Sequence, residues 1–293
     1  MTTITWRALL VEARGRLGSA SEARRIVERA SGYEGGEYHS CLDEAVTSGP
    51  AAHFDDMVAR RQRGEPLQYV LGAWGFRSLD LLVDQRVLIP RPETEVVVDV
   101  ALSELRRLEQ DRRERHEGTK RHPVVVDLGT GSGAIALSVA SEAPATQVWA
   151  TDRSRQALAV ARANLAGAGR AATRVKLAEG SWFAALPPIL RGQVDVVVSN
   201  PPYVGEHEVP DLPPEVARWE PREALVAGPT GLEQLVAIVS EARRWLSRPG
   251  AVVLEIAPHQ AQEAVALAYA EGYTEADVRP DLAGRLRALV ARV

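Results

Sequence analysis

The chain has 293 residues, 45% of them hydrophobic and 25% charged, a composition typical of globular proteins, and its length favours about two domains. Its net charge of -4 argues against a phosphate backbone as the main partner, because binding one needs a basic face. The single Cys41 excludes an internal disulfide, no apolar run is long enough to span a membrane, and no secretory signal opens the sequence. We therefore expect a cytoplasmic protein with no membrane segment.

Residues 5 to 63 show the spacing of short amphipathic helices. Leu9, Ala13 and Leu17 recur near the helical period, and Ser19 or Ser21 can cap a second helix. Glycines punctuate the segment, and no strand pattern is visible in it. We predict a small helical domain over residues 1–75.

Residues 76–90 have a different pattern, in which apolar and polar side chains alternate. The apolar positions lie on either side of Asp84-Gln85-Arg86 and are Leu79, Leu81, Val83, Val87 and Ile89. A period of two predicts a β-hairpin, which would link two domains. A helix is expected over residues 93–110. The polar stretch from 110 to 122 is interpreted as a helix end and loop, because acids and bases are interspersed there.

Apolar strand-like and helix-like segments alternate from Val124 onward. Predicted strands cover 124–126, 147–151, 175–177, 194–199 and 251–256, and predicted helices cover 134–140, 155–165 and 232–246. Segments near 273–279 and 287–292 can complete the sheet. This alternation predicts an α/β domain over residues 91–293 with a doubly wound parallel sheet covered on both faces.

A glycine-rich loop, Asp127-Leu128-Gly129-Thr130-Gly131-Ser132-Gly133, connects the first of these strands to the next helix. Glycines adopt backbone angles closed to other residues and let a ligand approach the chain closely. Two cofactors compete for this loop. Gly129, Gly131 and Ala134 satisfy the dinucleotide pattern G-x-G-x-x-G/A, and Asp152 lies near the distance of a ribose-binding acid. A tight turn without a ligand is the structural alternative.

Asp127 favours S-adenosylmethionine over a dinucleotide. A carboxylate beside the glycines would repel a pyrophosphate at the helix N-terminus, whereas S-adenosylmethionine has no phosphate and carries an ammonium and a sulfonium. Asp152 would then accept hydrogen bonds from both ribose hydroxyls. We predict a cofactor site made of Asp152 and the loop residues Asp127, Gly129, Thr130, Gly131, Ser132 and Gly133.

Asn200-Pro201-Pro202-Tyr203 follows the predicted strand 194–199. The two prolines end the strand and make the segment rigid. The side-chain oxygen of Asn200 and the carbonyl oxygen of Pro201 can accept the two hydrogens of a planar NH2 group, and Tyr203 can stack on its plane. Such acceptors favour the charge that develops as the nitrogen is methylated. The alternative is a proline-rich strand end with a buried tyrosine.

The chain resembles the release factor glutamine methyltransferases, the PrmC or HemK family, from about Glu65 onward. The similar segments, besides the two already described, are Glu65 to Gly72, Val87 to Glu95, Gly180 to Phe183, Glu220-Pro221, Ala224-Leu225 and Gly228 to Leu232. The segment Val87 to Glu95 resembles one that lies near the methionine end of the cofactor. Trp182 corresponds to the aromatic residue that flanks the adenine.

The resemblance implies a class I, Rossmann-like sheet of seven strands with the last antiparallel. It implies methyl transfer from S-adenosyl-L-methionine to the side-chain nitrogen of the glutamine in the Gly-Gly-Gln loop of peptide chain release factors, with S-adenosyl-L-homocysteine as product. Asn200, Pro201 and Tyr203 would carry the chemistry, Asn200 would also contact the cofactor, and Pro202 would help bind the substrate. The helical domain would help to dock the release factor.

Other hypotheses remain open at this stage. An adenine-N6 methyltransferase acting on nucleic acid uses the same Asn-Pro-Pro-Tyr pocket, but the further segments favour the glutamine enzymes and no direct nucleic-acid substrate is expected. A binding module that has lost catalysis is disfavoured by the retained Asn200 and Tyr203. No metal is expected, because the histidines show no ligand spacing with cysteine.

Overall fold

The computed structural model describes residues 4–114 and 121–293. The chain divides into two compact units, and each is described by itself. The first unit runs up to Trp74 and also includes Pro213–Trp219, and the second contains Gly75–Leu212 and Glu220–Val293. Part of the polar stretch interpreted as a helix end and loop, residues 115–120 with His116, lies outside the described residues.

The first unit is helical, as the spacing of apolar residues predicts. Its helices are α1 (Trp6–Leu17), α2 (Ala20–Ser31), α3 (Glu37–Cys41), α4 (Ser48–Gln62), α5 (Leu67–Leu71) and, from later in the sequence, α9 (Pro214–Trp219). Ser19 caps α2 by accepting a hydrogen bond from the Glu22 backbone N–H at 3.3 Å. Arg61 of α4 forms ion pairs with Glu22 of α2 and with Glu215 of α9. The sequence analysis predicted the helical domain over residues 1–75 and did not assign α9 to it.

A two-stranded hairpin is present, but its position differs from the prediction. It pairs β1 (Ala73–Phe76) with β2 (Leu79–Leu82), and Arg77, with φ of 52°, lies in the turn between them. The predicted turn at residues 84–86 forms, with the Val87 N–H donating to the Asp84 carbonyl at 3.0 Å, but no strand follows it, so the predicted strand through Val87 and Ile89 is wrong. The reason is a competing partner, because the Asn164 side chain accepts from the Leu82 N–H at 2.7 Å and donates to the Leu82 carbonyl at 3.0 Å.

The second unit is built around a seven-stranded sheet in the order β10-β11-β9-β6-β3-β4-β5. The strands are β3 (Val124–Leu128), β4 (Gln147–Asp152), β5 (Val175–Glu179), β6 (Val194–Ser199), β9 (Leu246–Glu255), β10 (Glu275–Pro280) and β11 (Leu286–Arg292). The last strand, β11, is antiparallel to both of its neighbours, and the pairs from β9 through β5 are parallel. The predicted seven-stranded sheet with an antiparallel last strand is confirmed.

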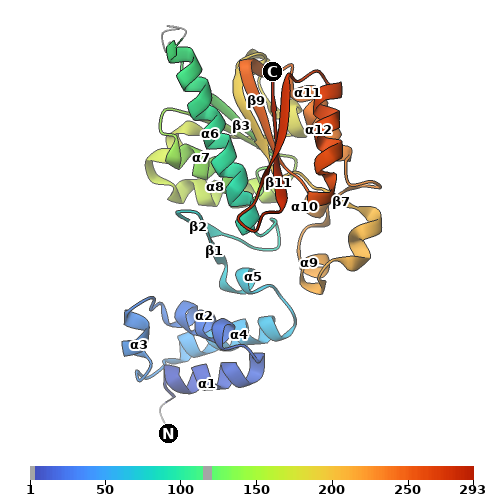
Figure 1. Cartoon of the computed structure of the whole chain (residues 1–293). Coiled ribbons are helices and arrows are strands. Elements are labelled where there is room, and N and C mark those ends of the chain that lie inside the picture. Colours follow the sequence, from blue (N-terminus) through green and yellow to red (C-terminus); the bar gives the residue numbers. More distant parts are fainter. Residues whose placement is uncertain (1–3, 115–120) are drawn as a thin grey trace. The chain divides into compact units, whose positions relative to one another are not determined.

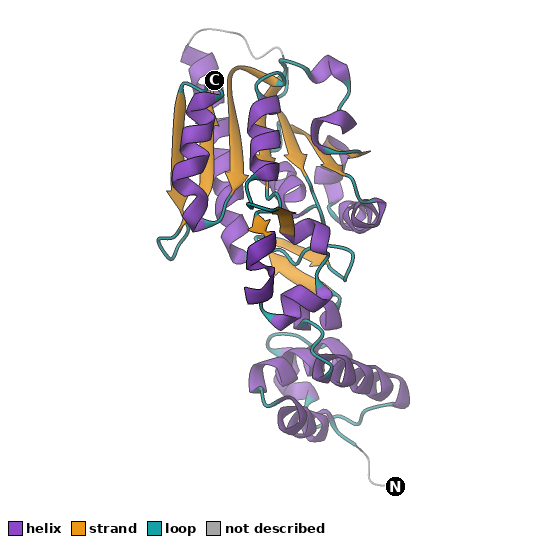
Figure 2. Ribbon diagram, turned by 90° about the vertical axis from the view of Figure 1, so that its right-hand side faces the viewer, coloured by secondary structure: helices purple, strands orange, loops and turns teal. Residues whose placement is uncertain are grey.

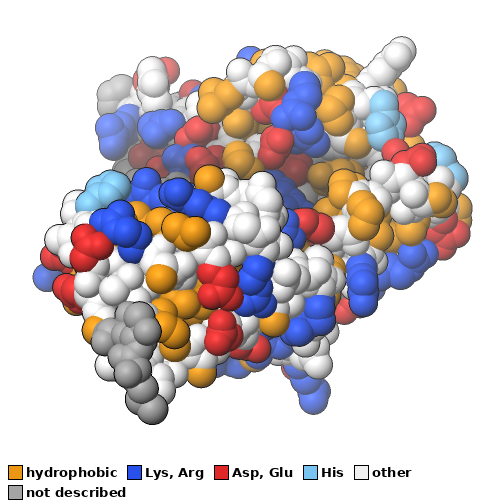
Figure 3. Space-filling view, turned by 90° about the horizontal axis from the view of Figure 1, so that it is seen from below, with side chains coloured by type: hydrophobic (Ala, Val, Ile, Leu, Met, Phe, Trp, Pro, Cys, Tyr) orange, Lys and Arg blue, Asp and Glu red, His pale blue; other side chains and the backbone are white. Residues whose placement is uncertain are grey.

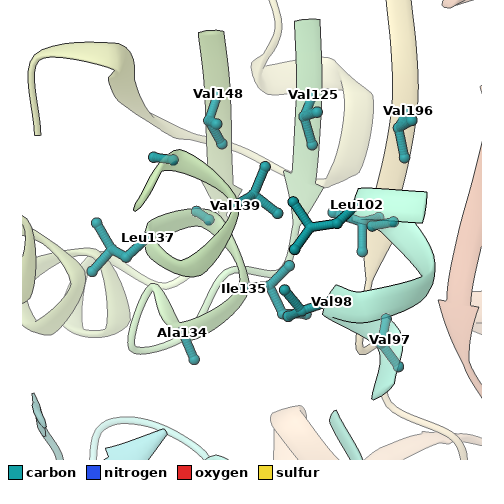
Figure 4. Close-up of a cluster of buried hydrophobic side chains, with 14 of the residues drawn as sticks. Val97, Val98, Leu102, Val125, Ala134, Ile135, Leu137, Val139, Val148 and Val196 are labelled. Atoms are coloured by element: carbon teal, nitrogen blue, oxygen red, sulfur yellow. The ribbon is translucent and has the colours of Figure 1, made fainter. Parts of the chain in front are cut away.

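Helices cover both faces of this sheet (Figures 1 and 2). On one face lie α6 (Pro92–Glu114), α7 (Ala134–Glu142) and α8 (Arg155–Gly167), and on the other lie α11 (Glu233–Ala242) and α12 (Ala261–Ala270). Figure 4 shows Val98 and Leu102 of α6 and Ile135 of α7 against the strand residues Val125 and Val196. The helix predicted over 232–246 ends earlier, at Ala242, because Leu246 already pairs with Val194 in the sheet.

A small two-stranded sheet and a short helix lie between β6 and α11. They are β7 (Val204–Gly205), which pairs with β8 (Val226–Gly228), and α10 (Arg222–Leu225). Across the described parts of the chain, no helix combines the length and the apolar character that crossing a membrane requires.

Candidate active site

A cavity opens at the carboxyl edge of the sheet, where β3 and β6 end side by side. Leu128 pairs with Ser199, so Gly129 and Asn200 leave the sheet at neighbouring positions. The strand order reverses here, since the chain runs outward through β4 and β5 and returns to β6 on the other side of β3. Ligands of doubly wound sheets bind at such reversals. Of the predicted site residues, those that line the cavity are Gly129, Gly131, Asp152, Trp182, Asn200 and Pro202.

The glycine loop presents bare backbone to this cavity. Gly129 and Gly131 have φ angles of 70° and 55°, in the left-handed region that favours glycine. A Cβ on Gly129 would lie 3.2 Å from the Trp182 ring, whereas a Cβ on Gly131 would meet no atom of the described residues within 4 Å. The loop is anchored by the Thr130 N–H, which donates to the Thr151 carbonyl at 2.9 Å. A ligand can therefore rest directly on the backbone at Gly131.

Asp127 is fully buried behind the loop and does not line the cavity. Its Oδ2 accepts from the Thr130 hydroxyl at 2.6 Å and from the Ala136 N–H at 3.1 Å, so it ties the loop to α7. Its Oδ1 has no hydrogen-bond partner among the described residues. Burial raises the pKa of this carboxyl to about 7. The side chain thus shapes the loop and retains an unused acceptor.

Asp152 ends β4 and faces the cavity. Its Oδ2 accepts from the Gly131 N–H at 3.0 Å and its Oδ1 accepts from the Ser154 N–H at 2.8 Å. Each carboxylate oxygen can accept a second hydrogen bond. Burial raises the pKa of Asp152 above its ordinary value. The carboxylate is therefore held in place and keeps two acceptor positions, which matches a pair of neighbouring hydroxyls.

Trp182 provides a flat apolar wall. Its φ of 46° is unusual for a residue with a side chain, and such strain is often found at ligand sites. The indole N–H donates to the Gln234 side-chain oxygen at 3.2 Å, and Gln234 in turn donates to the Ala227 carbonyl at 2.9 Å. These bonds hold the ring over Gly129, in the orientation that brings the two residues into contact.

The segment from Asn200 to Tyr203 follows β6 and contributes two residues to the cavity wall. Asn200 and Pro202 line the cavity, while Pro201 is buried. The Asn200 side-chain NH2 donates to the Thr94 hydroxyl at 3.2 Å. The Tyr203 carbonyl accepts from the Gln260 side chain at 3.0 Å, which holds the end of the segment. Burial and the nearby Glu255 raise the pKa of the Tyr203 hydroxyl, so the ring stays neutral.

Other predicted residues support the site from outside the cavity. Gly133 is the N-cap of α7, Thr130 bonds Asp127, and the Ser132 carbonyl accepts from Asn164 at 2.8 Å. Their contacts are with the loop and the surrounding helices, as are those of Asp127. Pro201 and Tyr203 likewise do not line the cavity.

Several cavity residues were not singled out by motif. They are Arg86, Arg153, Ser154, Ala157, Glu223 and Gln234. The backbone that follows residues 86–88 is fixed by Glu220, which accepts a hydrogen bond from the Ile89 N–H at 3.3 Å and forms an ion pair with Arg91. In the sequence, only the family segments around Val87 and Glu220-Pro221 indicated that this part of the chain belongs to the site. Within residues 4–114 and 121–293, no three His, Cys, Asp or Glu side chains gather as a metal site would require.

Comparisons with known proteins agree with this architecture. Residues 4–72 match the sequence profile of the PrmC N-terminal domain, and residues 114–213 match that of the methyltransferase small domain. A release factor glutamine methyltransferase of Burkholderia pseudomallei is 39% identical over 94% of this chain and 92% of its own. One from Deinococcus radiodurans is 37% identical over 98% of each chain. The solved hMettl16 catalytic domain, at 14% identity and a TM-score of 0.50 over 83% of this chain and 80% of that one, shares the fold.

Proposed function

Because this chain belongs to the release factor glutamine methyltransferase family, we propose that it transfers the methyl group of S-adenosyl-L-methionine to a glutamine side-chain nitrogen of peptide chain release factors. The target in this proposal is the glutamine of the Gly-Gly-Gln loop. The observation that carries it is the position of Asn200 beside the bare glycine loop, directly after the strand β6 that pairs with β3.

The cavity residues fit S-adenosylmethionine. The spare acceptors of Asp152 suit the two ribose hydroxyls, Trp182 offers a face for the adenine, and the backbone at Gly129 and Gly131 leaves room for the methionine part. Asp127 contributes by holding the loop from behind, and a carboxylate so close to the loop suits a ligand without phosphate groups. When bound, this cofactor supplies an electrophilic methyl group.

Asn200 and Pro201 position the substrate nitrogen. The Asn200 Oδ1 and the Pro201 carbonyl each accept one hydrogen of the glutamine NH2, and the Tyr203 ring packs on the amide plane. As the new C–N bond forms and the S–C bond breaks, positive charge grows on the nitrogen, and the two acceptors stabilise that charge. One amide proton then leaves to water, so no strong base is needed. The remaining product is S-adenosyl-L-homocysteine.

The first unit, α1 to α5 with α9, is the proposed docking element for the release factor. Its residues 4–72 match a domain profile that belongs to this family. Basic, acidic and apolar side chains are interspersed on the face shown in Figure 3 rather than gathered into one basic stripe. That distribution favours a protein partner over a nucleic acid, whose binding needs concentrated positive charge.

The test is transfer of labelled methyl from S-adenosylmethionine to purified release factor, compared with release factor whose Gly-Gly-Gln glutamine is replaced, and with DNA and RNA. We expect label on the intact release factor alone, located on that glutamine by mass spectrometry. Label on another residue would reject the glutamine target, and faster labelling of nucleic acid would replace this proposal with the adenine-N6 alternative.

A further inference from the structure

Asn200 is linked to two buried residues, Thr94 and Glu255, to which the sequence analysis assigned no role. The Thr94 hydroxyl, near the start of α6, donates to the Glu255 Oε2 at 2.6 Å, and the same hydroxyl oxygen accepts from the Asn200 NH2 at 3.2 Å. Thr94 is 3% exposed and Glu255 is 1% exposed. Glu255 is the last residue of β9, the strand that pairs with β6.

The direction of these hydrogen bonds follows from the chemistry of the groups. An ionised carboxylate can only accept, so the single hydrogen of the Thr94 hydroxyl is committed to Glu255. Toward Asn200 the hydroxyl therefore offers only a lone pair, and Asn200 must turn its NH2 toward Thr94. Its Oδ1 then points the other way. Without such a chain, the two ends of an amide are nearly equal in shape and either can face the substrate.

We propose that Thr94 and Glu255 are positioning residues, which hold the Asn200 amide with its oxygen toward the substrate nitrogen. This inference rests on the proposed function, since it assigns the cause of an orientation that methyl transfer requires. The reversed amide would present its own NH2 to the glutamine NH2, and two donors cannot bond. Neither Thr94 nor Glu255 needs to touch the substrate for this role.

The orientation should depend on pH through Glu255. Among the described residues, the side chains that act most strongly on this carboxyl are Thr94 and Glu93 of α6, Tyr203 of the loop after β6, and Arg287 of β11. Burial and Glu93 raise its pKa, while Thr94, Arg287 and Tyr203 lower it, and the result is a pKa of about 7. A protonated Glu255 can donate to Thr94, which frees the Thr94 hydrogen to donate to Asn200 and favours the reversed amide. Methyl transfer should therefore weaken as the pH falls through about 7.

The experiment measures single-turnover methyl transfer to release factor, at saturating cofactor, on both sides of pH 7. Thr94→Val nearly preserves shape and removes the hydroxyl. We expect transfer at alkaline pH to slow by roughly 10- to 100-fold, as for a misplaced reacting group, with the Kd for cofactor and the KM for release factor changed by less than about twofold. Thr94→Ser should restore the rate to within about threefold and keep the pH profile of the wild type. Thr146→Val is the matched control, at a buried threonine before β4 on the opposite edge of the sheet. It should change neither the rate of methyl transfer nor its pH profile.

Glu255→Gln provides an independent readout, because it removes the titrating group while leaving Thr94 in place. We expect its rate to lie below that of the wild type at alkaline pH and to lose the change near pH 7. A Thr94→Val enzyme with the rate and pH profile of the wild type overturns the inference, and so does a Glu255→Gln enzyme that keeps the titration. Asn200→Ala distinguishes a failure of the positioning role from a failure of the proposed function. If it is slow while both other variants behave as wild type, only the positioning role fails, and if it is fast, the proposed function of Asn200 fails.

Discussion

Buried carboxylates at the two ends of the central strands β6 and β3 differ in how many hydrogen-bond partners they have. At the amino end, Asp195 is fully buried and accepts from Arg112, from Arg121 at 2.8 Å, from the Val124 N–H at 2.7 Å and from the Ser247 hydroxyl at 3.0 Å. At the carboxyl end, the neighbouring strand β3 carries Asp127, which is equally buried but has an oxygen without a partner among the described residues.

This difference separates a structural carboxylate from those of a ligand site. A buried charge is tolerated when its hydrogen-bonding capacity is filled, and a buried charge with unfilled capacity shifts its pKa or needs a ligand. The raised pKa of Asp127, about 7, belongs to the second kind, because its Oδ1 has no partner among the described residues. Burial alone therefore does not distinguish the two edges of this sheet, whereas the completeness of the partner set does.

Removal of Asp195 should give the largest effect, and on stability alone. Asp195→Ala leaves Arg112, Arg121 and Ser247 without their shared acceptor, so we expect the unfolding free energy to fall by about 3–5 kcal/mol in urea titration. Asp43→Ala, which breaks the exposed ion pair with Arg7, is the control and should leave the midpoint almost unchanged. Equal effects of the two substitutions would contradict the assignment of Asp195 as a structural anchor.

Asn200→Ala should affect the rate rather than the stability. Loss of one preorganised acceptor at a developing charge costs roughly 3–4 kcal/mol, so single-turnover transfer at saturating substrate should slow by about 100- to 1,000-fold. The affinity for cofactor, measured on the same folded protein, should change much less. A rate within about threefold of the wild type would remove Asn200 from the mechanism.

Asp152→Ala should weaken cofactor binding by about 1.5–3 kcal/mol, the cost of losing hydrogen bonds to a charged group. Isothermal calorimetry with S-adenosylmethionine measures this directly, and circular dichroism confirms that the variant is folded. An unchanged affinity would reject the ribose assignment. Tight binding of a nicotinamide dinucleotide by the wild type would instead revive the competing interpretation of the glycine loop.

Asp127→Asn should alter how stability depends on pH. The pKa of Asp127 is about 7 in the folded chain and 3.8 in the reference state, so between these values the folded chain holds a proton that the unfolded chain lacks. This carboxyl therefore favours folding increasingly as the pH falls from 7 toward 4, and asparagine cannot do so. The difference in unfolding free energy, wild type minus variant, should rise by up to about 2 kcal/mol from pH 7 to pH 5 without cofactor. Parallel curves would show that Asp127 does not titrate there.

The sheet and the two main motifs were predictable because their signals are local. Parallel strands buried on both faces appear as short apolar runs, as in 124–126 and 194–199, and the glycine loop and Asn200 follow such runs directly. The hairpin was misplaced because the alternation at 79–89 indicates which side chains are buried and does not indicate which segments pair as strands. The partner that ends β2 is Asn164, which lies far along the chain.

The positioning residues were beyond the reach of sequence analysis for the same reason. Thr94 is separated from Asn200 by 106 positions and from Glu255 by 161. Only the placement of β9 beside β6, with the start of α6 against both, brings the three together. Thr94 lies within a family segment, but the pattern itself gives no indication of which polar group it would contact.

The grouping of α9 with the first unit has a consequence for recombination. The boundary between the units crosses the chain after Trp74, after Leu212 and after Trp219, so neither unit is encoded by one uninterrupted stretch of gene. A chimera that takes everything before Gly75 from one parent would inherit Arg61 from that parent and its ion-pair partner Glu215 from the other. Exchange of the whole helical unit between relatives therefore requires two insertions, and a single crossover leaves that unit with sequence from both parents.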